Sequence, residues 1–280
     1  MSEPDETISP ALSAPARVIV AIAQATRFYS RLPVPQLAFE TEPHALPDFS
    51  RIAWAVPIAG LIIGVIGGLA GALAMLAGLS PMIAASLTLA TLVIITGCFH
   101  EDGLADACDG LWGGMTPERR LEIMKDSRIG SYGAAGLALS LLIRFAALSE
   151  LFRLMGPYAG LAIPAVASFS RAISFVPAAM LNPAATKGLA ALAPMPGLRA
   201  LPLPLAIGGA VFAGTCLLLD LAPALWMAIA PLALVLMLAI SLMRRKIGGF
   251  TGDLLGATQQ LAEMALLLTF AAAISARGPF

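Results

Sequence analysis

The chain has 280 residues, of which 59% are hydrophobic and only 12% are charged, whereas a soluble globular domain carries about 25% charged residues. This composition excludes an ordinary soluble enzyme. The formal net charge is zero, so the chain has no basic field to hold nucleic-acid phosphates, and we expect no nucleic-acid partner. Its three cysteines contain no C-x-x-C pair and indicate no disulfide framework.

The sequence predicts a short N-terminal tail followed by one domain. Residues 1–16 are acidic and proline-rich, which is typical of a disordered tail and not of a cleaved signal. Residues 17–280 then form a single membrane-embedded domain. At its start, residues 18–31 are largely apolar, with Gln24, Arg27 and Arg31 on one helical face. This pattern predicts an interfacial helix that lies on the membrane.

Stretches of about 20 predominantly apolar residues, the length that a membrane-spanning helix needs, recur along the chain. They predict an all-α, polytopic integral membrane bundle of about seven transmembrane helices. In the first of them, Gly60, Gly64 and Gly68 form a small-residue stripe that lets helices approach closely. We favour packing within the chain for this stripe, and a homo-oligomer contact is the alternative. The seven predicted spans are 52–79, 82–99, 133–154, 158–181, 201–219, 222–243 and 258–276.

The charged side chains gather in three polar segments, because 25 of the 34 lie in residues 1–51, 101–128 and 244–253. If the N-terminus is cytoplasmic, thirteen Lys and Arg residues fall on the cytoplasmic side and only Arg153 and Arg277 on the other. The positive-inside rule therefore predicts a multi-pass protein of the cytoplasmic (inner) membrane with its N-terminus in the cytoplasm. The same orientation places two candidate active-site loops, about 100–132 and 244–257, on the cytoplasmic side.

An acidic run leaves the second predicted span. Asp102, Asp106 and Asp109 stand at i, i+4 and i+7, so a helix would align three carboxylates that repel one another unless a cation lies among them. Carboxylate oxygens suit Mg²⁺, which commonly adds substrate phosphates to its ligands. We therefore predict a magnesium site for a phosphorylated substrate, with a solvated acidic helix end as the alternative. His100 is a weaker candidate for proton transfer.

The next polar residues predict a phosphate-binding segment. Thr116 begins a short helix, and Lys125, Ser127 and Arg128 follow it beside a glycine turn. An ammonium group, a hydroxyl group and a guanidinium fork suit phosphate oxygens, although Lys125 alone is equally typical of a membrane anchor. Asp126 either completes the metal shell or pairs with Arg128.

The third polar segment, residues 248–257, begins with Gly-Gly-x-Thr-Gly. A glycine-rich loop that enters a helix exposes backbone N–H groups to anions, which makes Thr251 and Gly252 candidate phosphate-binding residues. Asp253 is a helix cap, a metal ligand or a base, and spacing does not decide among these roles. Farther inside the predicted spans lie Arg144, Arg171 and Glu263. Because buried charges are costly, we expect one of these arginines to neutralise Glu263.

Five short motifs then follow one another along the chain: RLPVP at 31–35, HEDGLADACDG at 100–110, EIMKDSRIG at 122–130, SR at 170–171 and GGFTGDLLGA at 248–257. In this order they resemble the cobalamin 5′-phosphate synthase family, also called adenosylcobinamide-GDP ribazoletransferases. The resemblance covers nearly the whole chain from about residue 25. Glu101 departs from the apolar residue that often follows the histidine, and its role stays open.

The resemblance implies an integral membrane, Mg²⁺-dependent enzyme of late cobalamin synthesis. It would join adenosylcobinamide-GDP to α-ribazole or α-ribazole 5′-phosphate, giving adenosylcobalamin or its 5′-phosphate and GMP. The acidic run would bind the metal, and Arg31, in the first motif, joins the predicted phosphate-binding residues. A base must take the proton of the ribazole hydroxyl. Asp106, Asp253 and His100 are the candidates, and the sequence does not choose among them.

Two alternatives differ in class. Another membrane transferase with an aspartate-rich motif, such as a CDP-alcohol phosphotransferase or an aromatic prenyltransferase, would need further aspartates or an Asn-Asp motif that this sequence lacks. A secondary transporter would couple cations through carboxylates near the middle of the membrane. The carboxylates here are predicted to gather at one membrane interface, which favours an enzyme.

Overall fold

The computed structural model describes residues 13–38, 40, 43, 45–185 and 188–277. The regular elements of the described chain are all helices, and its one β-type contact is an isolated bridge between Pro183 and Phe250. The helices in chain order are α1 (Ala14–Tyr29), α2 (Phe49–Ile52), η1 (Ala53–Ala55), α3 (Val56–Leu76), α4 (Pro81–Thr96), α5 (Phe99–Gly113), α6 (Pro117–Ile123), α7 (Ser131–Met155), η2 (Gly156–Leu161), α8 (Ala162–Ile173), α9 (Phe175–Met180), α10 (Leu189–Leu192), α11 (Pro202–Leu218), α12 (Pro223–Met227), α13 (Ile229–Lys246) and α14 (Gly252–Arg277).

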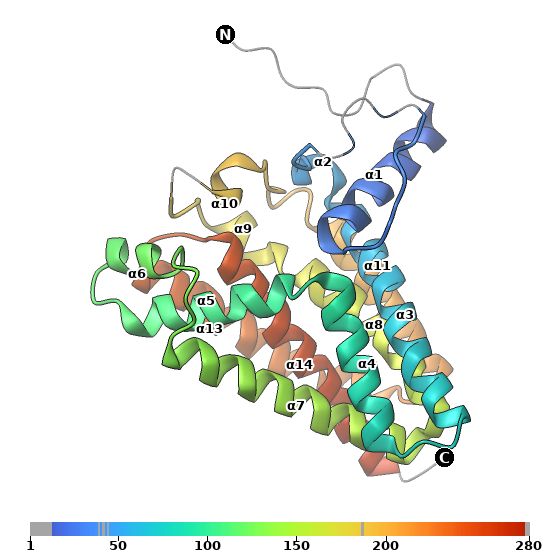
Figure 1. The fold of residues 1–280 in the computed structure, drawn as a ribbon. Helices are drawn as coiled ribbons and strands as arrows, with labels where there is room; N and C mark the ends of the chain where they lie inside the picture. Colours follow the sequence, from blue (N-terminus) through green and yellow to red (C-terminus); the bar gives the residue numbers. More distant parts are fainter. Residues whose placement is uncertain (1–12, 39, 41–42, 44, 186–187, 278–280) are drawn as a thin grey trace.

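The most extensive helix–helix contact in the bundle is between α3 and α8, which lie side by side in Figure 1. Gly60 faces the backbone of Ala167, Gly64 faces Pro164 and Gly68 faces Gly160, so the two helices run antiparallel. A Cβ atom at any of the three glycines would collide with the backbone of α8 or η2. The glycine stripe is therefore filled from within the chain, as we favoured, and the alternative of a homo-oligomer contact through Gly60, Gly64 and Gly68 is wrong.

The all-α, multi-pass character is confirmed, and length and composition identify fewer continuous candidate spans than the seven predicted segments. By length and composition, four helical stretches of the described chain are able to cross a membrane: Phe49–Leu76, Ser131–Met180, Pro223–Lys246 and Gly252–Arg277. A fifth is gained if α4 and α5, which meet at a bend of 86°, count as one span.

The lower count has a physical explanation. The predicted segments 82–99 and 201–219 form helices of 16 and 17 residues, and 16 residues of α-helix reach only about 24 Å where a bilayer core is about 30 Å thick. Segments 133–154 and 158–181 fall in the single helical stretch Ser131–Met180, which is counted once. Because the chain turns back at η2, both ends of this stretch lie on the side of the site, and α7 and α8 are two passes. Hydropathy identified the apolar residues correctly, but it does not measure where a helix ends.

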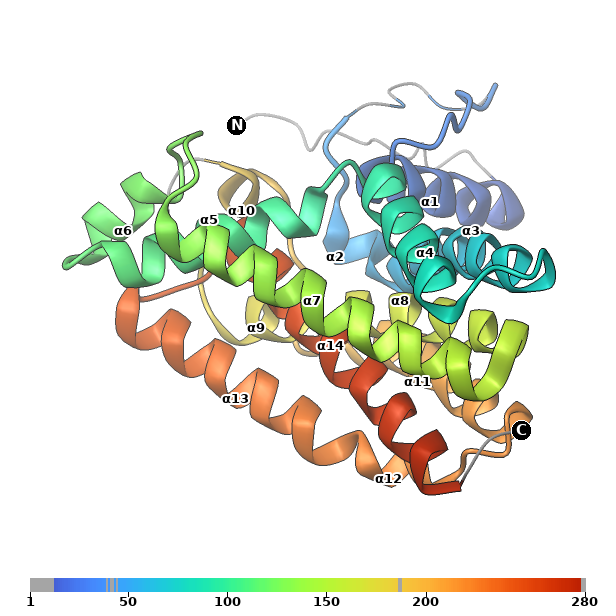
Figure 2. The same ribbon diagram turned by 60° about the horizontal axis from the view of Figure 1, so that its bottom comes forward.

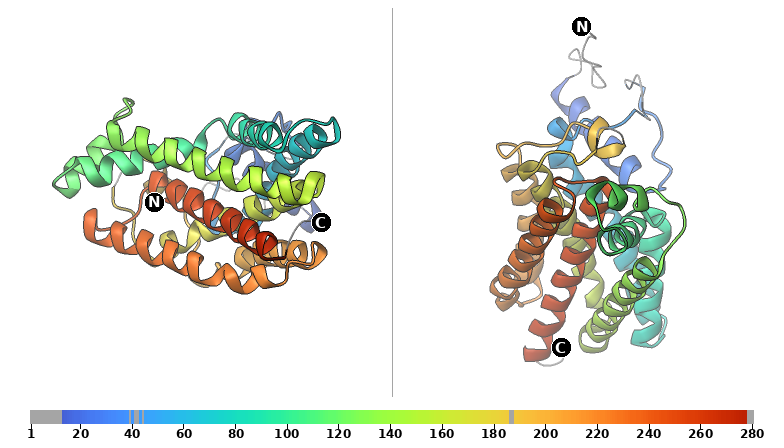
Figure 3. Two further views of the ribbon diagram at one scale, coloured as in Figure 1. Left: turned by 90° about the horizontal axis from the view of Figure 1, so that it is seen from below. Right: turned by 90° about the vertical axis from the view of Figure 1, so that its left-hand side faces the viewer.

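The bend between α4 and α5 places the acidic helix. Gly97 (φ 63°) and Cys98 (φ 60°) both adopt left-handed backbone conformations at this junction, which a glycine allows without strain and a cysteine does not. Beyond the bend, α5 runs across the end of α4 (Figures 1 and 2) and packs against α7 and α14. Seen from below, α14 lies between α7 and α13 (Figure 3).

The N-terminal helix is longer than expected. Helix α1 begins at Ala14, within the tail predicted for residues 1–16, and residues 1–12 of that tail lie outside the described residues. Its predicted polar face does not all meet water, because Gln24 is buried. Arg27 instead binds Glu40, with 2.7 Å between Nη2 and Oε2, and so ties the segment after α1 to the helix.

Candidate functional site

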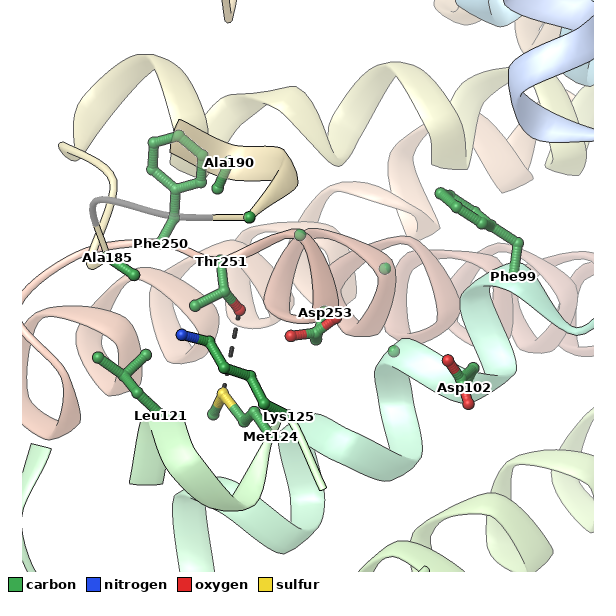
Figure 4. Close-up of a pocket in the computed structure, with 14 residues that line it drawn as sticks. Phe99, Asp102, Leu121, Met124, Lys125, Ala185, Ala190, Phe250, Thr251 and Asp253 are labelled. Atoms are coloured by element: carbon green, nitrogen blue, oxygen red, sulfur yellow. Dashed lines mark hydrogen bonds between the residues drawn. The ribbon is translucent and has the colours of Figure 1, made fainter. Parts of the chain in front are cut away.

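A cavity of about 290 Å³ lies where α5, α6, α10 and the beginning of α14 meet. Its polar lining combines carboxylates, an ammonium group and a helix N-terminus. Figure 4 shows Asp253 between Thr251 and Asp102, with the amine of Lys125 on the side of Thr251. The sequence analysis singled out five of the lining residues: Asp102, Lys125, Thr251, Gly252 and Asp253.

The loop before α14 is held by backbone contacts that only glycine permits. Phe250 N donates to Asn182 O at 3.0 Å, and Ala184 N donates to Phe250 O at 2.9 Å. Gly249 lies against Asn182 and Ala184 so closely that a Cβ atom would collide with their backbone. The segment after α9 therefore fixes the position of Thr251 and of the first turn of α14.

Thr251 caps α14, since its Oγ1 accepts the N–H of Leu254 at 3.3 Å. The interpretation of Asp253 as the cap is therefore wrong. Asp253 instead lies in the first helical turn, half-buried, and lines the cavity. The unpaired N–H groups of a helix N-terminus attract anions, so Asp253 and a phosphate would compete for this end of α14 unless a cation lies between them.

Helices α5 and α14 approach closely at Gly103, where a Cβ atom would lie 3.0 Å from Asp253 O. This approach brings Asp102 and Asp253 to one cavity although they are far apart in the sequence. Asp106, one turn beyond Asp102, is half-buried and close enough to interact electrostatically with Asp102, Asp253 and Asp109. The repulsion that the spacing predicted for the acidic run is therefore present, with Asp253 added to it.

Asp109 has a different environment from the other carboxylates. Its Oδ2 accepts the N–H of Gly130 at 2.7 Å and its Oδ1 accepts the N–H of Gly133 at 2.9 Å. Both donors belong to the beginning of α7, so Asp109 fastens α7 to α5. Its side chain is buried and does not line the cavity of Figure 4.

Asp126 forms an ion pair with Arg128, with 2.7 Å between Oδ2 and Nη2. Of its two predicted roles, metal ligand or partner of Arg128, the structure shows the second. This hydrogen-bonded guanidinium holds the pKa of Asp126 at about 2. Both side chains are turned to the outside and do not line the cavity of Figure 4. Within the described ranges, no three His, Cys, Asp or Glu side chains come together as a complete metal shell.

Three other predicted residues lie around this centre. Ser127 lines a second cavity beside Asp102 and Asp106. Arg31 lies over Gly97 at the α4–α5 bend and does not line the cavity of Figure 4. His100 is buried, with its ring stacked on Tyr29 at 5.6 Å between centroids. Neither of the two cavities includes His100 in its lining.

A buried charge network beneath the site was predicted only in part. Arg144 Nη1 lies 3.2 Å from Glu263 Oε1, which confirms that an arginine neutralises Glu263, and 2.9 Å from Glu101 Oε1. Gln259 donates to Glu263 Oε2 at 2.7 Å. The sequence analysis left Glu101 without a role. The signal available was a second carboxylate at a membrane boundary, where unpaired charge is costly.

The chain is similar to a family of known proteins over most of its length. Residues 21–271 match the model of the family described as Cobalamin-5-phosphate synthase. A relative from Azorhizobium caulinodans, named adenosylcobinamide-GDP ribazoletransferase, is 46% identical over 259 residues, covering 90% of this chain and 95% of its own. A relative of the same name from Mesorhizobium japonicum is 41% identical and covers 98% and 100% of the two chains. No solved structure matches the chain significantly.

Proposed function

The chain belongs to the cobalamin-5-phosphate synthase family, and from this premise we propose that it is an adenosylcobinamide-GDP ribazoletransferase of the cytoplasmic membrane. It joins adenosylcobinamide-GDP to α-ribazole or α-ribazole 5′-phosphate, forms adenosylcobalamin or adenosylcobalamin 5′-phosphate, and releases GMP. The observation that carries this proposal is the cavity in which Lys125 and the N-terminus of α14 meet the carboxylates of Asp102 and Asp253.

The cationic side of the cavity suits a diphosphate. Lys125 supplies an ammonium group on a long exposed side chain, and the first turn of α14 supplies backbone N–H groups and the positive end of a 26-residue helix dipole. Gly252 leaves the approach to these N–H groups open. Charge stabilisation of this kind is most of what phosphoryl transfer requires of a protein.

The acidic side fits Mg²⁺ by the chemistry of its donors. Asp102 and Asp253 offer hard carboxylate oxygens in the cavity, and Asp106 lies one turn away. Mg²⁺ usually takes one or two carboxylates and completes its shell with water and phosphate oxygens, so an incomplete protein shell suits it. When bound, the ion would neutralise charge on the diphosphate and reduce the repulsion among these aspartates.

The reaction balances as a substitution at phosphorus. The ribazole hydroxyl oxygen forms a bond to the phosphorus on the cobinamide side, and the bond from that phosphorus to the oxygen of the leaving GMP breaks. The hydroxyl proton passes to a carboxylate within hydrogen-bond reach. Asp106 and Asp253 line cavities and are the better-placed bases, whereas the His100 ring packs against Tyr29.

The test is GMP release by the purified protein in lipid nanodiscs, given adenosylcobinamide-GDP and α-ribazole with and without Mg²⁺. We expect GMP and a cobalamin product in equal amounts, and only when Mg²⁺ is present. GMP without a cobalamin product would indicate hydrolysis and would contradict the transferase assignment. Full turnover in the presence of a chelator would overturn the magnesium assignment and leave the transferase assignment standing.

A further inference from the structure

A second cavity, of about 240 Å³, lies on the other side of Asp102. Its walls are of two kinds. Val93 of α4 and Leu137 and Leu141 of α7 make an apolar side, and Glu101, Asp102 and Asp106 of α5 make an acidic side. A cavity with apolar walls and a few convergent polar groups is typical of a small-molecule site.

The geometry of α5 separates the two cavities. At about 100° per residue, Phe99 and Gly103 lie about 60–100° to one side of Asp102, and Ala105 and Glu101 lie about 60–100° to the other side. The first two line the cavity of Figure 4, and the last two line the second cavity. Asp102 lines both cavities. Asp106, about 40° from Asp102 on the side of Phe99 and Gly103, lines the second cavity, so these two aspartates together form the boundary between the cavities.

Glu101 provides an independent sign that the second cavity takes a ligand. Its side chain is 93% buried, with Oε1 accepting hydrogen bonds from Arg144 at 2.9 Å and from Gln260 at 3.4 Å. Its Oε2 is also buried and has no hydrogen-bond partner within the described part of the chain. A buried acceptor without a donor costs about 1–3 kcal/mol. An O–H or N–H group of a ligand in this cavity would remove that cost.

We propose that the second cavity binds the acceptor substrate, an aromatic nucleoside, while the cavity of Figure 4 binds the diphosphate of the donor. This inference rests on the proposed function and deepens it. The apolar side suits the flat aromatic base, and the acidic side suits hydroxyl groups on the sugar. A hydroxyl held there lies beside Asp106, and the donor lies on the far side of Asp102. Both substrates are then bound at once, each in its own cavity.

The arrangement predicts that the two binding sites are blocked separately. Leu137→Trp fills part of the second cavity with an indole ring and leaves the polar side chains of the lining unchanged. Leu139→Trp is its matched control, because Leu139 lies on the same helix, is 59% exposed and lines neither cavity. Leu141→Phe, with Leu142→Phe as its control, tests the same wall with a smaller change.

The experiment measures binding of α-ribazole alone, binding of adenosylcobinamide-GDP alone, and steady-state turnover, all in nanodiscs. For Leu137→Trp or Leu141→Phe we expect the Kd and KM of α-ribazole to rise about tenfold or more, with the Kd of adenosylcobinamide-GDP unchanged. Both control variants should match the wild type. Thermal unfolding of each variant identifies those that do not fold, and the other substitution then decides.

Two outcomes would overturn the inference. If α-ribazole binds the cavity-filled variants as it binds the wild type, the second cavity is not the acceptor site and holds something else, such as a lipid acyl chain. If adenosylcobinamide-GDP loses affinity instead, the two substrates are assigned to the wrong cavities. Failure of the proposed function is distinct, because the wild type itself would then form no cobalamin product.

Discussion

The aspartates of α5 share one helical face and yet have different environments. Asp102 opens into both cavities, Asp106 lies half-buried among other carboxylates, and Asp109 is occupied by two backbone N–H groups of α7. A regular i, i+4, i+7 spacing therefore does not mean a common role. The environments of the three side chains differ because α14 contacts α5 near Gly103, whereas the start of α7 contacts it near Asp109.

Replacing Asp102 or Asp106 by asparagine should abolish turnover. A neutral amide keeps the size of the side chain but is a poor ligand for Mg²⁺ and cannot accept the hydroxyl proton, so we expect kcat to fall by at least about a hundredfold. GMP release measures the loss, and a circular dichroism melt of each variant checks that it is folded. Asp220→Asn, whose side chain is 81% exposed and pairs with Arg277, is the matched control. Turnover near the wild-type rate in both site variants would remove Asp102 and Asp106 from the metal site.

Asp109→Asn should affect stability first. An asparagine offers one carbonyl oxygen where the carboxylate receives two N–H groups, and its amide would face a backbone donor. We expect a loss of about 1–3 kcal/mol in the free energy of unfolding, measured by chemical denaturation in detergent micelles. Residual activity in the surviving folded protein would separate this helix-fastening role from metal binding. An unchanged stability together with complete loss of turnover would instead favour Asp109 as a ligand.

The sequence predicted the residue types at the site better than their partners. The acidic spacing and the basic residues nearby were enough to select Asp102, Lys125 and Thr251. The partners of Asp109 lie 21 and 24 residues farther along the chain, and nothing in the local pattern indicates them. Side-chain partners of this kind depend on how helices cross, which a single sequence does not reveal.

At the scale of helices, α5 is held by charge as well as by packing. Arg144 of α7 contacts Glu101 of α5 and Glu263 of α14, and Ser170 of α8 accepts a hydrogen bond from Gln259 of α14 at 3.0 Å. Four helices thus meet in one buried polar network directly beneath the two cavities. Its members are costly to bury singly, so the network specifies one arrangement of these helices.

Arg144→Met should therefore destabilise the protein strongly. The substitution keeps an unbranched side chain but leaves Glu101 and Glu263 buried without a cation, and breaking a buried pair in this way costs about 3–5 kcal/mol. Arg153→Met is the control on the same helix, because Arg153 pairs with Glu150 at the surface and should contribute less than about 1 kcal/mol. Chemical denaturation of both variants compares the two losses. Equal losses would mean that the buried network adds nothing beyond a surface pair.

Local signals predicted where helices begin better than how far they run. Thr116 caps α6 as the sequence indicates, accepting the N–H of Arg119 at 3.3 Å. The apolar stretch 82–99, by contrast, looked like one span, and the structure bends it at Gly97 and Cys98. A left-handed cysteine has no reliable sequence signature, since context alone makes it adopt that backbone conformation.

For the whole molecule, the basic segments and the two cavities gather at one end of the bundle. Arg120 Nη1 donates to Lys246 O at 2.8 Å, which joins the basic segment around α6 to the one that ends α13. At the opposite end, Arg277 donates to Leu219 O at 2.9 Å. The carboxylates of the site thus lie at an end of the membrane helices and not halfway along them, which favours an enzyme over a cation-coupled transporter.

The positive-inside rule predicts that the end of the bundle with the two cavities faces the cytoplasm. In a background without Cys98, Cys108 and Cys216, a cysteine at Met115, between α5 and α6, should react with a membrane-impermeant maleimide in inverted inner-membrane vesicles and not in right-side-out ones. Met115 is 88% exposed, so its side chain is accessible wherever the loop lies. A cysteine at Ala77, which is exposed at the C-terminal end of α3, should show the reverse pattern. The opposite labelling would contradict the predicted orientation.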